Sequence, residues 1–431
     1  MDAAQLALDD ASLRDRLELP RVADPRRAAA HGRPGGTSEA ERERTEAAVA
    51  FVGDLKATAM GEARFLIACC KTKRAVSAPA AELYASPLFV RSAELARRLG
   101  IPMSILSAKH GLIPAELEIE PYDQTLKTCS AAERREWAER VASSARSDLA
   151  PREHLILLAG STYSNELVPM LEAGGWTVSR PLAGMALGER LSFLNRTHRV
   201  LDRREAVERF YGDMARLAAR SGLMRLPDLL KGDLPARGVY FFFDPDEATP
   251  HGKAMPRLVR VGTHAVSAGS KASLRTRLRA HLGTAAGLGN HRSSVFRLHV
   301  GEAMSSRDGS TARFPSWGSG QSAGAEVIGE EAELEREVSR YISRLLVLCL
   351  DVDDEPGKGS MRAVIERHSI ALFTESRAPL DPPSANWLGS HSRQVAIRGS
   401  GLWNVRAVGE RADLQVVGGI SRWFGDTPAG G

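Results

Sequence analysis

Short apolar segments alternate with longer amphipathic ones in the first half of the chain, and this alternation constrains the fold more than any other feature. Each short segment ends sharply in polar residues, which is typical of a buried strand. Strand alternating with helix predicts an α/β domain with a doubly wound, mostly parallel sheet covered on both faces. The expected strands are residues 63–70, 102–108, 154–160 and 175–181, and the expected helices lie near residues 79–99, 130–147 and 162–173.

The second half follows a different pattern, which predicts an α+β domain. Its expected strands are residues 238–243, 257–263, 294–301 and 345–352, with a basic helix near residues 272–282 and an acidic helix near residues 330–344. A charged helix near residues 202–221 leads away from the first domain. We therefore expect a partly disordered lead over residues 1–60, with a short helix, a loop at Pro34–Gly36 and a helix from about Ser38. The α/β domain then covers residues 61–222, a linker residues 223–235, and the second domain residues 236–431.

Charge is concentrated in one window of this 431-residue chain, whose net charge is only +5. Residues 251–300 contain nine lysines and arginines, five histidines and no acidic residue. Such a window favours a polyanionic partner, so we expect DNA to bind. Four cysteines without a CxxC pair argue against a zinc ribbon and a secreted disulfide scaffold. The acidic start and the lack of any run of about 18 apolar residues predict a cytoplasmic, non-exported protein that does not span a membrane.

The tripeptides at residues 238–240 (GVY) and 260–262 (RVG) stand about twenty residues apart and precede the basic helix. On that helix Arg277 and His281 are four residues apart and share a face. These features resemble the GIY-YIG nuclease family. The resemblance implies that Tyr240 activates or positions water, that Arg277 binds the scissile phosphate, and that His281 assists it.

The same resemblance implies one glutamate on a later helix as ligand of a divalent metal, with Mg²⁺ as the possible cofactor. The acidic helix offers four candidates, of which we favour Glu335; the others are Glu331, Glu333 and Glu337. A hard cation and a fixed guanidinium suit a phosphodiester transition state, which gathers negative charge. The position expected to carry the second tyrosine is Arg260. The stretch at 360–405, with Asn386 and Asn404 as possible groove residues, looks like an extension that completes the fold.

Polar residues in the first domain gather where its strands are expected to end. They are found at residues 69–73, 109–111, 121–124 and 160–163. In a parallel sheet such loops converge on one edge, so these four segments would build one pocket.

The segments CCKTK, LYASPLF, SAKHGL, PYDQTL and LAGSTYSNEL resemble a bacterial domain family of unassigned function. That family is similar to the uracil-DNA glycosylase superfamily and to the lysine-bearing domain of archaeosine synthase, and one branch contains anti-phage glycosylases acting on glucosylated hydroxymethylcytosine. Hydrolysis of an N-glycosidic bond needs a carboxylate to activate water and an aromatic surface for a flipped base, but no metal. Asp123 is the candidate carboxylate and His110 the candidate donor to the leaving base. The candidate substrate-binding residues are Lys71, Lys73, Lys109, Tyr122 and Tyr163.

These observations predict a DNA glycosylase that excises a modified base, possibly from phage DNA, joined to a GIY-YIG-like module for DNA binding or strand cleavage. Three alternatives stay open. The first is a metal-dependent endonuclease in which the first domain only recognises modified DNA. The second is a non-catalytic nucleic-acid-binding protein, and the third a transferase that modifies transfer RNA.

Overall fold

The computed structural model describes residues 38–58, 62–252, 254–266, 269–357 and 359–425. The short helix expected near the start and the loop at Pro34–Gly36 lie outside the described residues. The described residues form two compact units, residues 44–201 and residues 202–425 together with residues 38–43. No helix within the described ranges is long and apolar enough to cross a membrane.

The unit of residues 44–201 is built on a five-stranded sheet with the order β4-β3-β1-β6-β7. Strand β1 lies at the centre and pairs in parallel with β3 and β6, and β7 continues the parallel arrangement beyond β6. This confirms the predicted doubly wound, mostly parallel sheet. The strands are β1 (Ala63–Ala68), β3 (Met103–Ser107), β4 (Gly111–Pro114), β6 (His154–Leu158) and β7 (Thr177–Ser179). The antiparallel edge strand β4 was not expected, because its four residues follow β3 so closely that they look like part of a turn.

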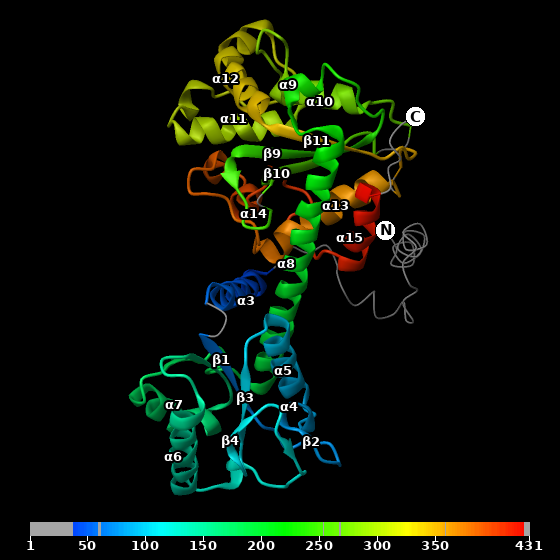
Figure 1. Ribbon diagram of the computed structural model, residues 1–431. Helices are drawn as coiled ribbons and strands as arrows, with labels where there is room; N and C mark the ends of the chain where they lie inside the picture. Colours follow the sequence, from blue (N-terminus) through cyan, green and yellow to red (C-terminus); the bar gives the residue numbers. More distant parts are fainter. Residues whose placement is uncertain (1–37, 59–61, 253, 267–268, 358, 426–431) are drawn as a thin grey trace, which may run out of the picture. The chain divides into compact units, whose positions relative to one another are not determined.

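Helices cover both sides of this sheet, with α6 and α7 on one side and α4 and α5 on the other (Figure 1). Local signals explain where they begin: Ser86 caps α5 in front of Pro87, and Ser130 and Glu133 form a capping box at α6. The helices are α3 (Glu39–Ala57), α4 (Ala80–Leu83), α5 (Pro87–Leu99), α6 (Ala131–Asp148), α7 (Ser161–Ala173) and the first part of α8 (Leu187–Ser221). A short 3-10 turn (Leu126–Thr128) and the pair β2 (Ala78–Pro79) and β5 (Glu118–Ile119) complete the unit.

The second unit is built on a four-stranded antiparallel sheet with the order β10-β9-β11-β8. Its strands are β8 (Met224–Arg225), β9 (Gly238–Ala248), β10 (Pro256–Thr263) and β11 (Leu346–Asp351). The first motif strand, β9, lies between β10 and β11, so its residues Val239 to Phe243 are fully buried. The two motifs face each other directly, because Tyr240 pairs with Gly262 across the ladder.

Helices α9 to α12 lie on one face of this sheet and α13 and α14 on the other (Figure 1). The helices are α9 (Leu226–Leu229), α10 (Leu274–Leu282), α11 (Val295–Arg307), α12 (Ala325–Arg344), α13 (Met361–Thr374), α14 (Val395–Ser400) and α15 (Leu414–Gly425), with short 3-10 turns at His291–Ser293, Thr311–Arg313, Glu375–Arg377 and Leu388–His391.

The strand expected at residues 294–301 is wrong, because this segment forms the start of α11. Ser294 caps the helix by accepting a hydrogen bond from the Arg297 amide. Nearly every side of α11 is buried, so its sequence lacks the polar face by which an amphipathic helix is recognised.

Residues 223–235, expected as a linker, instead contain β8 and α9. Strand β8 pairs with β11, and Leu226 and Leu229 of α9 lie in the core of the second unit. The two compact units divide at Leu201 and Asp202, inside the long helix α8. Helix α13, which we took for part of an extension, packs against β9 and β10. Short polar segments look alike in sequence whether they join domains or pair with a distant strand.

Candidate active site

Tyr240 and His281 form a buried pair between strand β9 and helix α10. The Tyr240 hydroxyl lies 2.9 Å from Nε2 of His281, and Nδ1 of His281 lies 2.7 Å from the Ser294 hydroxyl. Both side chains have no exposed surface. The structure therefore brings together two of the expected site residues, and it adds Ser294, which holds the imidazole from behind.

The glycines of the two motifs are explained by close approaches of neighbouring atoms. A Cβ atom on Gly262 would lie 2.3 Å from the Tyr240 hydroxyl oxygen, and one on Gly238 would lie 2.3 Å from the Leu350 carbonyl oxygen. No side chain fits at such distances. Gly262 thus leaves the space that the phenol ring needs to reach His281.

His281 is held in its neutral form. Burial lowers its pKa well below the ordinary value, and the nearby charges of Arg260, Arg277 and Arg297 lower it further. A neutral imidazole has one ring nitrogen free to accept a proton. His281 can therefore accept the proton of the Tyr240 hydroxyl.

Two arginines stand next to this pair. Arg277 is half-buried, and its guanidinium makes no hydrogen bond or ion pair with any described residue. Arg260 is 7 % exposed, donates to the Trp403 carbonyl over 2.6 Å, and lies 4.7 Å from the centre of the Phe296 ring, yet its buried Nε has no partner among the described residues. Both guanidiniums thus retain donors for an anion such as a phosphate.

Glu366 on α13 is a site residue that sequence reasoning missed. It is half-buried near Thr263, at the end of β10. Burial raises the pKa of Glu366, while the charges of Arg260, Arg277 and Arg406 oppose that shift. The only sequence signal was an acidic residue on a helix rich in buried apolar residues, and we had assigned that helix to an extension.

Glu335, the expected metal ligand, is instead held by hydrogen bonds to neighbouring side chains and backbone. Its carboxylate accepts from Nε of Arg297 at 2.9 Å and from both the backbone amide and Nδ1 of His291, at 2.7 and 3.0 Å. The Gly318 amide donates to Nε2 of His291, so the imidazole proton is on Nδ1, which donates a hydrogen bond to the Glu335 carboxylate. Burial would raise the pKa of Glu335, but these partners outweigh it and hold that pKa below its ordinary value. The expected metal ligand is therefore already saturated with hydrogen bonds.

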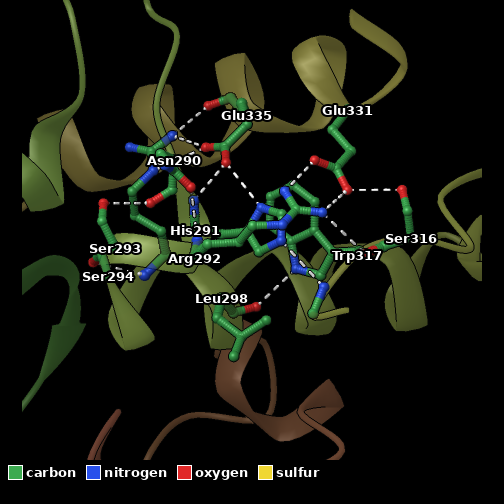
Figure 2. A network of polar contacts seen from close by, with 12 residues as sticks. Asn290, His291, Arg292, Ser293, Ser294, Leu298, Ser316, Trp317, Glu331 and Glu335 are labelled. Atoms are coloured by element: carbon green, nitrogen blue, oxygen red, sulfur yellow. Dashed lines mark hydrogen bonds and ion pairs between the residues drawn. The ribbon is translucent and has the colours of Figure 1, made fainter. Parts of the chain in front are cut away.

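Glu335 and Glu331 both lie on helix α12, and Figure 2 shows them in contact with the adjacent residues His291 and Arg292. Glu331 receives Arg292 in a bidentate ion pair, with distances of 2.6 and 2.8 Å. His291 stacks on Trp317, with ring centres 3.9 Å apart. The two remaining candidates, Glu333 and Glu337, form exposed ion pairs with Arg313 and Arg340.

A magnesium ion fits this site only if the substrate shares its coordination. The described part of the chain has no cluster of three or more His, Cys, Asp or Glu side chains that could hold a metal. Mg²⁺ in phosphate-processing sites usually keeps several waters and takes one or two carboxylates together with substrate phosphates. Glu366 is a single carboxylate near Arg260 and Arg277, whose charges oppose the rise in its pKa that burial causes, and it meets that requirement.

In the first unit the expected strand-end residues do converge. Cys69, after β1, lies 3.1 Å from the Tyr163 hydroxyl on α7. The Tyr122 hydroxyl lies 2.7 Å from Oγ of Ser107 and 2.8 Å from the Tyr84 hydroxyl. Burial raises the pKa of Tyr84 to about 12, and also raises the pKa values of Tyr122 and Tyr163, so these hydroxyls stay protonated.

The remaining candidates lie around Tyr122. The ammonium groups of Lys73 and Lys109 lie 4.2 and 5.7 Å from the centre of its ring, and the His110 ring meets it edge-on at 5.4 Å. Burial lowers the pKa of His110, and the charge of Lys109 adds to that effect. Lys71 and Asp123 are exposed, and neither side chain has a hydrogen-bond partner among the described residues. The structure thus does not place the Asp123 carboxylate in the hydrogen-bonded cluster.

A separate cavity of about 350 Å³ opens at the start of α7. Ser161, Ser164, Arg180 and Arg190 are among the residues that line it. Of the four segments expected to build the pocket, only the one at residues 160–163 contributes to this cavity, through Ser161, and none of the individually named candidate residues lines it.

A neutral Tyr–His pair near two arginines that retain hydrogen-bond donors, together with a single carboxylate, is compatible with chemistry on phosphodiesters. A family model described as a GIY-YIG domain matches residues 201–428, more than half of the 431 residues. The chain therefore belongs to the GIY-YIG family, which confirms that part of the sequence-based identification. A model described as a family of unknown function (DUF6884) matches residues 65–196, so the likeness to uracil-DNA glycosylases is not confirmed. No curated protein and no solved structure matches the chain.

Proposed function

We propose that this protein is a divalent-metal-dependent endonuclease that cleaves DNA, with the chemistry carried out by the unit of residues 202–431. The observation that carries the proposal is the 2.9 Å contact between the Tyr240 hydroxyl and Nε2 of neutral His281, beside Arg277 and Glu366. A GIY-YIG domain supports a nuclease function. Of the expectations from sequence, the endonuclease that recognises its DNA through the first unit is thus better supported than base excision.

The residues divide the reaction between them. Arg277, which has a free guanidinium, binds the scissile phosphate, and Arg260 offers a second buried cation. Glu366 holds Mg²⁺, which, when bound, neutralises charge on the phosphate oxygens. We assign the metal to Glu366 rather than Glu335 because the latter is committed to Arg297 and His291.

Proton transfer completes the scheme. The Tyr240 oxygen is buried in the structure, so this scheme requires that substrate binding first opens a path to it. A water oxygen then attacks phosphorus and gives its proton to the Tyr240 oxygen, while the proton of the Tyr240 hydroxyl passes to Nε2 of His281. The bond from phosphorus to the leaving sugar oxygen then breaks, and that oxygen keeps the bonding electrons and takes a proton from solvent water. Because His281 is neutral, one of its ring nitrogens has a lone pair available for this proton.

The test is cleavage of supercoiled DNA by the full chain with Mg²⁺ or with EDTA. We expect nicks only with Mg²⁺, and we expect Arg277→Ala and Glu366→Gln to abolish them. Arg279→Ala is the matched control, because Arg279 is exposed on the same helix two residues further on. Cleavage in EDTA, or equal loss in Arg279→Ala and Arg277→Ala, would contradict the proposal.

For the unit of residues 44–201, we propose only that it recognises the DNA target. Modified phage DNA is one substrate that the sequence suggested. Comparing cleavage of unmodified DNA with cleavage of DNA containing glucosylated hydroxymethylcytosine tests this, and equal rates would argue against it. Release of a free base in EDTA would revive the glycosylase interpretation.

A further inference from the structure

Two lysines of the first unit are held over one tyrosine ring. Lys73 follows β1 and Lys109 follows β3, and these neighbouring parallel strands end side by side because Ala68 pairs with Leu106. Their ammonium groups lie 4.2 and 5.7 Å from the centre of the Tyr122 ring. The topology of the sheet thus gathers two positive charges that are 36 positions apart in the sequence.

No acidic group balances these charges within the described part of the chain. Neither lysine forms an ion pair there, whereas Arg74 on the same loop pairs with Glu82 at 3.3 Å. Asp123, next to Tyr122, is exposed and pairs with neither lysine. A cation–π contact leaves the positive charge in place, so the half-buried ring orients the ammonium groups without neutralising them. The partner that is missing from this arrangement is an anion.

The Tyr122 ring, which positions the lysines, is fixed through its hydroxyl group. The Tyr122 hydroxyl lies within hydrogen-bond distance of Oγ of Ser107, at 2.7 Å, and of the buried Tyr84 hydroxyl, at 2.8 Å. Ser107 also accepts from the His110 amide over 3.0 Å. Because Ser107 is itself fully buried, it ties the Tyr122 ring to the core of the unit. Little side-chain freedom is then lost when a ligand binds.

We propose that Lys73 and Lys109, positioned by Tyr122, bind backbone phosphates of DNA, as a second contact besides the catalytic site. This inference rests on the proposed function only in taking DNA as the ligand. Lysine ammonium groups bind phosphate as point charges. Because Lys73 covers one face of the Tyr122 ring, that face is not free to stack on a base. The contact therefore fixes the position of the DNA and carries no sequence information.

The salt dependence of DNA binding tests this directly. Each phosphate contact contributes about 0.9 to the slope of log Kd against log salt concentration for duplex DNA. In EDTA, with labelled duplex DNA and the full chain, we expect the double variant Lys73→Gln/Lys109→Gln to lower that slope by about 2. We expect Tyr122→Ala to lower it as well and Tyr122→Phe, which keeps the ring, to change it little.

The matched control is Arg135→Gln/Arg140→Gln, which removes two positive charges from α6, where each arginine pairs with a glutamate one turn away. An unchanged slope in the lysine variant, or an equal decrease in the control, would overturn the inference. Tighter binding of RNA than of DNA, lost in the lysine variant, would also overturn the assignment to DNA. Circular dichroism and thermal unfolding establish that each variant is folded.

The two proposals fail in distinguishable ways. If the wild-type chain cuts DNA but the lysine variant keeps its salt slope, only the second phosphate contact is refuted. If the chain never cuts DNA but the slope decreases, the contact stands and the endonuclease does not.

Discussion

The Tyr240 hydroxyl lies 2.9 Å from Nε2 of His281, and neither side chain has exposed surface. The first residue comes from β9 and the second from α10, 41 positions further along the chain. Burial sets the chemistry of this contact, because it keeps the imidazole neutral and able to accept a proton.

Removing either partner of this contact should impair cleavage without preventing DNA binding. We expect Tyr240→Phe and His281→Gln each to slow cleavage by about 100- to 10,000-fold, the range typical of general acid–base groups. Single-turnover cleavage rates measure the effect, and Kd measured in EDTA should change little. A variant that cuts at the wild-type rate would remove the pair from the mechanism.

Glu366 and Glu335 should respond in opposite ways to the same substitution. Glu366→Gln should abolish Mg²⁺-dependent cleavage while leaving the free energy of unfolding nearly unchanged. Glu335→Gln should instead destabilise the protein by about 3–5 kcal/mol, because it takes the charge partner from the fully buried Arg297. Denaturant unfolding and cleavage assays on both variants decide the matter, and the reverse pattern would restore Glu335 as the metal ligand.

Gly262→Ala should disturb the site through a single added methyl group. The new Cβ would meet the Tyr240 hydroxyl at 2.3 Å, so the ring must move away from His281. We expect a loss of about 1–3 kcal/mol in stability together with a loss of cleavage. Gly329→Ala on α12 is the control, since no atom lies within 4 Å of its added Cβ. It should keep activity and gain a little stability.

The buried, neutral His281 should make stability depend on pH. Its pKa lies well below 6.5 in the folded chain and near 6.5 in the unfolded chain. As the pH falls through 6.5 the unfolded state binds the proton first, so stability is present above that pH and decreases below it. Thermal unfolding between pH 7.5 and about 5 should show a smaller pH effect in His281→Gln than in the wild type. His391→Gln, at an exposed position, should keep the full pH effect.

Some of the candidate site could be predicted because it depends on short-range patterns. The spacing of the two motifs and of Arg277 and His281 placed these side chains on neighbouring strands and on one helix face. Glu366 could not be chosen, because many acidic residues stand on helices and only the tertiary structure shows which of them lies within electrostatic reach of Arg260 and Arg277. Glu335 looked free to bind a metal because the residues that occupy its carboxylate, His291 and Arg297, lie some 40 positions away in the sequence. Nothing near Glu335 in the sequence shows these contacts.

Asn404 gives a second example of this limit. The sequence suggested a groove residue, yet its side-chain amide pairs with both the amide and the carbonyl of Val261 on β10. It thus extends the hydrogen bonding of an edge strand, a role that depends on a backbone 143 positions away.

The sequence by itself determined the alternating α/β pattern of the first unit and the motif strands of the second, which follow from periodicity and spacing over a few residues. It pointed to Tyr240, His281 and Arg277 through the resemblance to the GIY-YIG family. The tertiary structure alone decided that residues 294–301 are helical, which glutamate is free, and that two lysines share one aromatic ring. Those outcomes depend on burial and on contacts between distant segments, and neither is expressed in the local order of residues.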